Sequence, residues 1–138
     1  YAFAIWDIFY YIWLKVALNW PSSWLEWDLL FLVPTAWASP WIAPAICSAL
    51  MIVLAVVILK FPKTSVKPLE WIMLVLSALV FLVSFVWDYM GLWAIGDRSK
   101  IMEVVATYVP TQYNWWLFAI GVVLTGLAIC SFLRRAKR

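Results

Sequence analysis

Four long runs of apolar residues dominate the sequence, and shorter polar or tryptophan-rich segments separate them. Each run is close to the roughly 20 helical residues that span the hydrocarbon core of a bilayer, which is about 30 Å thick. The runs are Ala2–Leu18, Trp41–Leu59, Trp71–Trp87 and Trp115–Leu133. The pattern predicts an all-α integral membrane protein of one domain, with four transmembrane helices in a bundle over residues 2–19, 41–60, 69–92 and 114–133.

The two longer connectors are predicted to carry short helices at the outer membrane surface. Ser23 and Glu26 fit a capping box, and Pro34 would stop the helix that follows. An interfacial or re-entrant helix is therefore predicted over residues 24–33. In the second connector, apolar side chains at helical spacing predict a surface helix over residues 99–108.

Composition places the chain in a membrane rather than in water. Of its 138 residues, 67% are hydrophobic and 12% are charged, whereas soluble domains carry roughly 25% charged residues. Basic residues gather in the segment 60–70 and in the C-terminal tail 134–138. The positive-inside rule puts both segments and both termini in the cytoplasm, and we expect the bacterial inner membrane. Topology thus accounts for the net charge of +3, and no nucleic-acid partner is expected.

The chain contains no histidine, which argues against haem, zinc and di-iron sites. Cys47 and Cys130 are expected at different depths, about 9 and 22 Å along their helices from the outer ends. A disulfide needs Cα atoms within about 7 Å, so both are expected to be packing residues. We predict no metal, no catalytic residue and no required cofactor, while a bound lipid or pigment is compatible with the sequence.

Four acidic residues are candidates for a functional role: Asp7, Glu26, Asp28 and Asp88. Asp7 shares one helix face with Tyr11 and Lys15. If its helix begins well before Tyr1, Asp7 lies near mid-membrane and is a functional candidate. If the helix begins near Tyr1, Asp7 is an interfacial acid that interacts favourably with the helix dipole. Asp88 is expected near the outer interface, bonded to another helix or to the outer loops.

Tryptophan is unusually frequent. The chain has 12, whereas two interfacial belts on four helices need about eight. The surplus is expected to contact lipid, other membrane subunits or a second copy of the chain through Trp20, Trp24, Trp27, Trp37, Trp41, Trp93, Trp115 and Trp116. In the last run, Gly121/Thr125 and Gly126/Cys130 place small residues four apart, which predicts the closest helix packing there.

Three short elements resemble the heterodimeric lycopene-cyclase domains, which are small bundles of membrane helices. They are Trp87-Asp88, Gly91-Leu92-Trp93 and Pro110, in that order. The family has an acidic pair near this proline, and Tyr113 and Asn114 stand there in this chain. The resemblance is confined to the segment 87–114, and no activity is transferred from it.

The leading functional prediction is a non-catalytic accessory subunit of a larger membrane complex, because a tryptophan surplus occurs without any catalytic motif. The alternative is a membrane-embedded enzyme or binding protein for a hydrophobic, isoprenoid-like ligand such as a carotenoid, quinone or lipid. Aromatic rings would then stabilise a cationic intermediate. A proton-coupled carrier that uses Asp7 is the third. Convergence of Glu26, Asp28 and Asp88 on one cavity would favour the alternative, and their scatter would favour the subunit.

Overall fold

The computed structural model describes residues 1–31, 36–90 and 112–137, with the side chain of Phe31 left aside. This part of the chain is mostly helical. Its elements in order are α1 (Ala2–Leu18), β1 (Trp27–Phe31), β2 (Trp37–Pro40), α2 (Ile42–Lys60), α3 (Pro68–Met90) and α5 (Trp115–Ala136). The surface helix predicted over residues 99–108 lies outside the described residues.

Three of the helices are long and apolar enough to cross a membrane. They are α2, α3 and α5, with 19, 23 and 22 residues, or about 28 to 35 Å at 1.5 Å per residue. Helix α1 has 17 residues, which corresponds to about 25 Å. The structure therefore supports three spans, and α1 is the shorter fourth helix.

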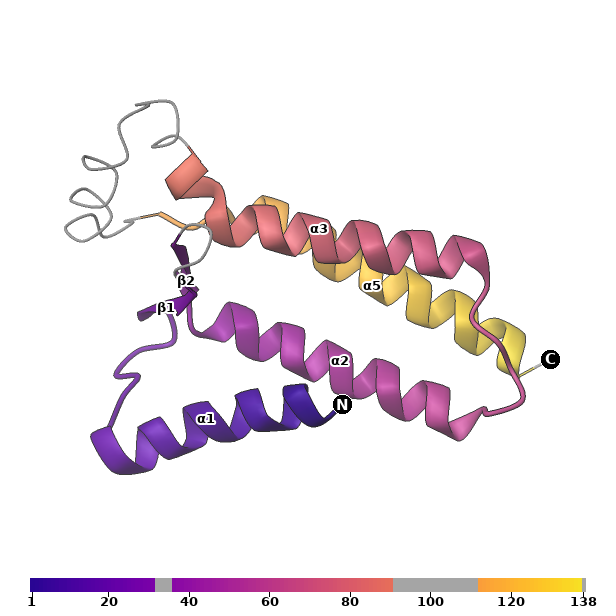
Figure 1. Ribbon diagram of the computed structural model, residues 1–138, viewed down its shortest axis with the longest axis horizontal. Helices are drawn as coiled ribbons and strands as arrows, with labels where there is room; N and C mark the ends of the chain where they lie inside the picture. Colours follow the sequence, from indigo (N-terminus) through magenta and orange to yellow (C-terminus); the bar gives the residue numbers. More distant parts are fainter. Residues whose placement is uncertain (32–35, 91–111, 138) are drawn as a thin grey trace.

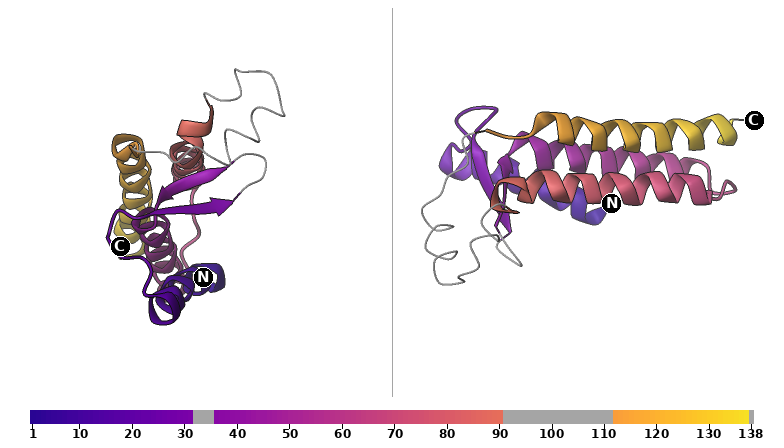
Figure 2. Two further views of the ribbon diagram at one scale, coloured as in Figure 1. Left: turned by 90° about the vertical axis from the view of Figure 1, so that its left-hand side faces the viewer. Right: turned by 90° about the horizontal axis from the view of Figure 1, so that it is seen from above.

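The helices do not form a closed bundle. Helices α3 and α5 pack side by side along their length and α2 packs on α5 (Figure 1). Among the described helices, α1 makes an extended contact with α2 alone. The two strands lie across one end of the helices, which we call the sheet end (Figure 2). At the opposite end, the loop end, residues 61–67 connect α2 to α3 close to the C-terminus.

Local sequence signals set several helix ends. Asn19 ends α1 in the left-handed conformation, with φ of 52°, which asparagine tolerates better than most residues. Pro68 occupies the first position of α3, where its missing N–H costs no hydrogen bond. The side chain of Asn114 caps α5 by accepting a 3.1 Å hydrogen bond from the Leu117 N–H.

The interfacial helix predicted over residues 24–33 is wrong, and so is the prediction that the fold is all-α. Strand β1 pairs antiparallel with β2, with Asp28 opposite Ser39 and Leu29 opposite Ala38. An isolated helix of ten residues is marginal, since even good sequences need about 12–15. Strand pairing satisfies the backbone of both segments instead. Glu26 therefore closes a turn and does not cap a helix.

Two buried clusters lie at the sheet end, where the strands meet the helices. The first contains Ala36, Ala38 and Tyr89 and is packed by Trp27. The second contains Ala43, Phe85 and Phe118 and is packed by Trp37 and Phe81, among others. Away from these clusters many large apolar side chains are exposed, among them Val56, Leu59 and Ile72. Such surfaces suit helices whose solvent is lipid.

Candidate functional site

An open groove of about 630 Å³ lies between α1, α2, α3 and the sheet. Its walls are apolar and aromatic, and they include Trp6 and Tyr10 from α1, Met51 from α2, and Ala78 and Phe81 from α3. The groove forms because α1 packs extensively on α2 and not on α3, so no described helix fills the space between α1 and α3. Its volume falls in the range of about 300–1,000 Å³ that is usual for small-molecule sites.

Two carboxylates line this groove. Asp7 Oδ2 accepts a 2.8 Å hydrogen bond from the Ser48 hydroxyl of α2. Asp28 Oδ2, on β1, accepts a 2.8 Å hydrogen bond from the Tyr11 hydroxyl. Because Asp7 and Tyr11 are one turn apart on α1, these two hydrogen bonds bring both carboxylates to the same stretch of the α1 wall.

The hydrogen bond to Ser48 gives the position of Asp7 along the helices. Ser48 lies six residues after the first residue of α2, about 9 Å along the helix axis. Asp7 therefore lies beside the half of α2 that is nearer the sheet end. The depth of Asp7 in a membrane, on which the two sequence interpretations differ, stays a prediction.

Two of the predicted acids lie elsewhere. The Glu26 carboxylate accepts hydrogen bonds from the Ser22 hydroxyl at 2.7 Å, from the Ser22 N–H, and from the Ser23 N–H at 3.2 Å. These bonds, the Ser22 hydroxyl first, hold the pKa of Glu26 below its usual value. Asp88 is half-buried on α3 and is not among the groove-lining residues. Glu26, Asp28 and Asp88 therefore do not converge on one cavity, and the groove brings Asp28 together with Asp7 instead.

Most of the singled-out tryptophans build two aromatic clusters at the sheet end. Around Tyr11, the ring centroid of Trp41 lies at 5.5 Å and that of Trp20 at 6.3 Å, and Trp24 stacks on Trp41 at 5.7 Å. Around Tyr113, the centroids of Trp27 and Trp115 lie at 6.2 and 4.9 Å.

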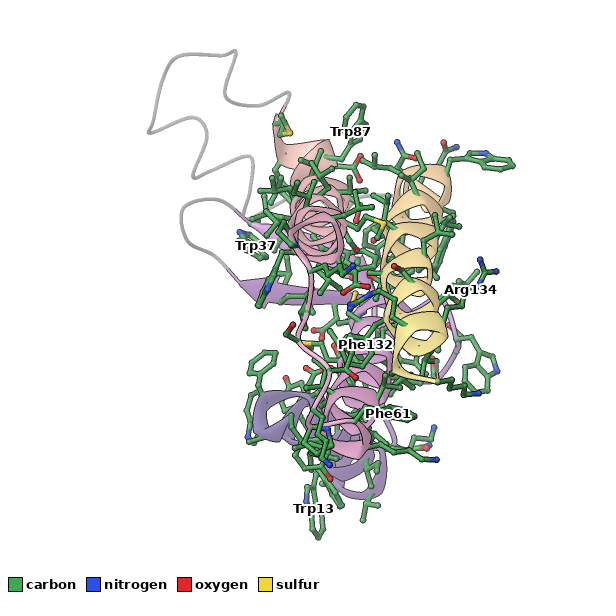
Figure 3. The ribbon with its side chains drawn as sticks, turned by 90° about the vertical axis from the view of Figure 1, so that its right-hand side faces the viewer. Trp13, Trp37, Phe61, Trp87, Phe132 and Arg134 are labelled. Carbon is green, nitrogen blue, oxygen red and sulfur yellow. The ribbon has the colours of Figure 1, made fainter. Side chains whose placement is uncertain are left out.

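Other aromatic residues point into the groove or away from the protein. Trp37 lines the groove, and Trp116 is 86% exposed. Trp13 and Trp87 project away from the helices on different sides (Figure 3), which suits contact with lipid. Trp93 lies outside the described residues.

The cluster around Tyr113 is also polar at its centre. The Tyr113 hydroxyl is 3.0 Å from the Ser84 hydroxyl of α3. Burial raises the pKa of the Tyr113 hydroxyl, so this group stays protonated at physiological pH and remains a hydrogen-bond donor.

Only one of the two predicted small-residue rows lies in a helix contact. Ser77 Oγ of α3 donates a 2.7 Å hydrogen bond to the Gly121 carbonyl and lies 2.6 Å from the Thr125 hydroxyl. By contrast, no atom lies within 4 Å of a Cβ added at Gly126, and Cys130 is exposed. Gly126 and Cys130 therefore do not take part in the close helix packing predicted for them, because their row points away from α3.

Sequence reasoning missed an ion pair at the loop end. Glu70 on α3 is 2% exposed and accepts a 3.0 Å hydrogen bond from Arg135 Nε of α5, with Arg135 Nη2 on its other oxygen. Ser131 donates a further 2.9 Å hydrogen bond to Glu70. Arg134, the next residue, points away from the bundle (Figure 3). The sequence did carry a signal for this pair, because Glu70 stands at the start of the third apolar run and Arg135 just after the fourth.

A smaller pocket of about 450 Å³ adjoins the groove beside the C-terminal half of α1. Trp24 and Trp41 form part of its wall, and Tyr11 lines both this pocket and the groove. Lys15 also lines it, and Lys15 Nζ donates a 2.9 Å hydrogen bond to the Pro21 carbonyl. Basic charge is therefore present in the smaller pocket, while the described lining of the groove has acidic charge only.

Comparisons of the chain with protein-family models, with curated proteins and with solved structures gave no match. Among the described residues, no group of three or more His, Cys, Asp or Glu side chains could hold a metal ion. The chemistry that this part of the chain offers is therefore that of the groove, which combines apolar walls with two hydrogen-bond-accepting carboxylates.

Proposed function

We propose that this chain is an integral membrane protein that binds a hydrophobic ligand of the isoprenoid-like or lipid class in the groove between α1, α2 and α3. One observation carries the proposal: an open groove of about 630 Å³ has apolar walls and carries two carboxylates, Asp7 and Asp28. An amphipathic ligand matches this arrangement, because its tail would cover the aromatic and aliphatic walls while its head group bonds to the carboxylates.

The rim of the groove supports entry from the bilayer. Phe3 and Trp6 of α1 are 56% and 61% exposed, and Leu82 of α3 is 39% exposed. Large apolar side chains at an opening would be unfavourable in water and are favourable in lipid. A ligand dissolved in the membrane would therefore reach the groove sideways, without crossing an aqueous surface.

We further propose that α1 is a fourth membrane-embedded helix and that the loop end faces the cytoplasm of a bacterial inner membrane. Lys60, Lys63 and Lys67 lie at the loop end with the basic end of α5, whereas Glu26 and Asp28 lie at the sheet end. Excess basic charge on one side of the membrane supports this orientation. Helix α1 runs antiparallel to α2 from beside its middle past the sheet end (Figure 1).

The accessory subunit remains the second candidate. The observation that favours it is the same space beside α1, since among the described helices α1 makes an extended contact with α2 alone. A helix of another membrane protein would fill this space as well as a lipid would, because interhelical packing and hydrogen bonds both stabilise helix association in bilayers.

Filling the groove with a larger side chain tests the proposal. Ala78 lines the groove on α3, and its replacement by Phe places a ring where the ligand tail would lie. Ala119, an exposed residue of α5 that is not among the groove-lining residues, supplies the matched control, Ala119→Phe. The protein is purified in mild detergent, and native mass spectrometry measures the fraction of molecules that carry a bound lipid.

We expect the wild type and Ala119→Phe to retain the same bound molecule and Ala78→Phe to lose most of it, because the added ring would displace apolar ligand contact that stabilises binding by roughly 25 cal/mol per Å². Equal retention by all three proteins would contradict the proposal. Co-purification of the wild type with another membrane protein, lost in Ala78→Phe, would support the accessory subunit instead.

A further inference from the structure

The carboxylates of the groove also indicate the chemistry of the head group. We propose that the groove selects amphipathic amines, with a primary ammonium group held between Asp7 and Asp28 and the hydrocarbon tail along α1, α2 and α3. This inference rests on the proposed function, since it assumes that the groove is a ligand site, and it names the ligand class that the site prefers.

Both carboxylates have acceptor capacity to spare. Each uses Oδ2 for its hydrogen bond, Asp7 from Ser48 and Asp28 from Tyr11. No described residue donates to Oδ1 of either, and an ionised carboxylate can accept several hydrogen bonds through its two oxygens. A primary ammonium has three donors and no acceptor, an alcohol has one donor, and a carboxylate head group has none. Of these head groups, the primary ammonium alone has more than one donor, as two carboxylates require.

Charge gives the same order of preference. Asp7 and Asp28 both line the groove, and no lysine or arginine is among the described residues that line it. Unpaired charges at membrane depth are costly and normally find a partner of opposite sign. A bound cation would supply this partner, whereas an anionic head group would add a further negative charge.

The aromatic rings on α1 add a second attraction for a cation. Trp6 and Tyr10 stack with their ring centroids 5.7 Å apart, and Tyr10 meets Tyr11 edge-on at 5.3 Å. All three rings line the groove. A cation within about 6 Å of the centroid of such a ring is attracted to the electron-rich face of the ring, most strongly where water is excluded.

The adjoining smaller pocket has the opposite charge, since Lys15 is among its lining residues and no carboxylate is. A general attraction of cations to this end of the protein would favour both sites equally. The proposal instead places the amine in the groove alone. An anionic amphiphile has a better position beside Lys15 than in the groove.

Three probes that share one oleyl tail test the inference: oleylamine, oleyl alcohol and oleic acid. Each is added at equal concentration to the full chain in dodecyl maltoside at neutral pH, and native mass spectrometry gives the bound fraction. We expect oleylamine to exceed oleyl alcohol by about tenfold in affinity, equivalent to about 1.4 kcal/mol. Asp7→Asn and Asp28→Asn should each reduce this preference several-fold. Asp88→Asn removes the same charge outside the groove and should leave the preference unchanged.

The outcomes separate the two proposals. If none of the three probes binds, the groove is not a lipid site and the proposed function fails. If oleylamine and oleyl alcohol bind equally well, the groove is a ligand site and the amine inference alone is overturned. A preference that survives both Asp7→Asn and Asp28→Asn also overturns it. The comparison of probes on the wild type decides the matter even if an Asn variant fails to fold.

Discussion

Replacing Gly121 with Ala probes a close contact between α5 and α3. A Cβ built at Gly121 of α5 would lie 2.6, 2.8 and 3.0 Å from three ring atoms of Phe81 on α3. Carbon atoms are best separated by about 3.5–4.0 Å. The ring must therefore move by about 1 Å, or α5 must move away from α3 and stretch the hydrogen bond between Ser77 and the Gly121 carbonyl.

The expected cost follows from overpacking. Extra atoms in a well-packed contact usually destabilise by about 1–3 kcal/mol, while exchanging Gly for Ala within a helix favours folding by about 0.8–1 kcal/mol. Gly121→Ala should therefore change the free energy of unfolding by between about zero and a loss of about 2 kcal/mol. The lower end applies if the Phe81 ring retreats into the groove that it lines.

Gly126 supplies the control on the same helix. An added Cβ there meets no atom within 4 Å, so Gly126→Ala carries the gain in helix propensity without the clash. The difference in unfolding free energy between the two variants should be about 1–3 kcal/mol, with Gly126→Ala the more stable. Reversible unfolding in mixed micelles with increasing dodecyl sulfate, followed by far-UV circular dichroism, measures it.

The two variants also differ in what they do to the groove. If the ring of Phe81 moves into the groove, Gly121→Ala should bind less lipid than Gly126→Ala in the same native mass spectrometry assay. Equal unfolding free energies for the two variants would refute the reasoning, because they would show that Gly121 does not lie against α3 as the structure has it.

Two further predictions concern the charged residues outside the groove. Glu70→Gln removes the charge that pairs with Arg135 and should destabilise by roughly 1–3 kcal/mol, less than for a fully buried pair because the Arg135 side chain is 26% exposed. Arg134→Gln is the control and should change the unfolding free energy by under about 0.5 kcal/mol. Equal losses in Glu70→Gln and Arg134→Gln would contradict a stabilising ion pair between Glu70 and Arg135. Because hydrogen bonds from Ser22 lower the pKa of Glu26, its contribution is present above the ordinary glutamate pKa and is lost as the pH falls through the lowered one. Hydrogen exchange at Ser22 and Ser23 should therefore be faster in Glu26→Gln than in the wild type at neutral pH, and a difference that persisted at strongly acidic pH would disprove this role.

The first connector shows why sequence reasoning went wrong at one point. Ser23 and Glu26 have the spacing of a capping box, and the same two residues interact in the structure, but within a turn. The local signal was thus read correctly as an interaction and wrongly as a helix start. What decided the outcome was β2, a segment about ten residues later, whose backbone pairs with β1.

The sequence by itself determined α2, α3 and α5, the three helices that are long and apolar enough to cross a membrane. A helix forms its hydrogen bonds within one segment, so a sufficiently long apolar run specifies its own structure and its preference for lipid. The local capping residues at Asn19 and Pro68 are equally independent of the rest of the chain.

Only the tertiary structure decided the sheet, the open side of the bundle and the groove. Such features depend on contacts between residues far apart in the chain. Asp7 with Ser48 and Tyr11 with Asp28 hold α1 at the groove, and Glu70 with Arg135 joins α3 to α5 at the loop end. In a chain with so few charged residues, a carboxylate among apolar neighbours must find a donor, and several donors at suitable depth would satisfy it equally well. Which donor it meets is set by how the helices pack, and for α1 that is its contact with α2 alone.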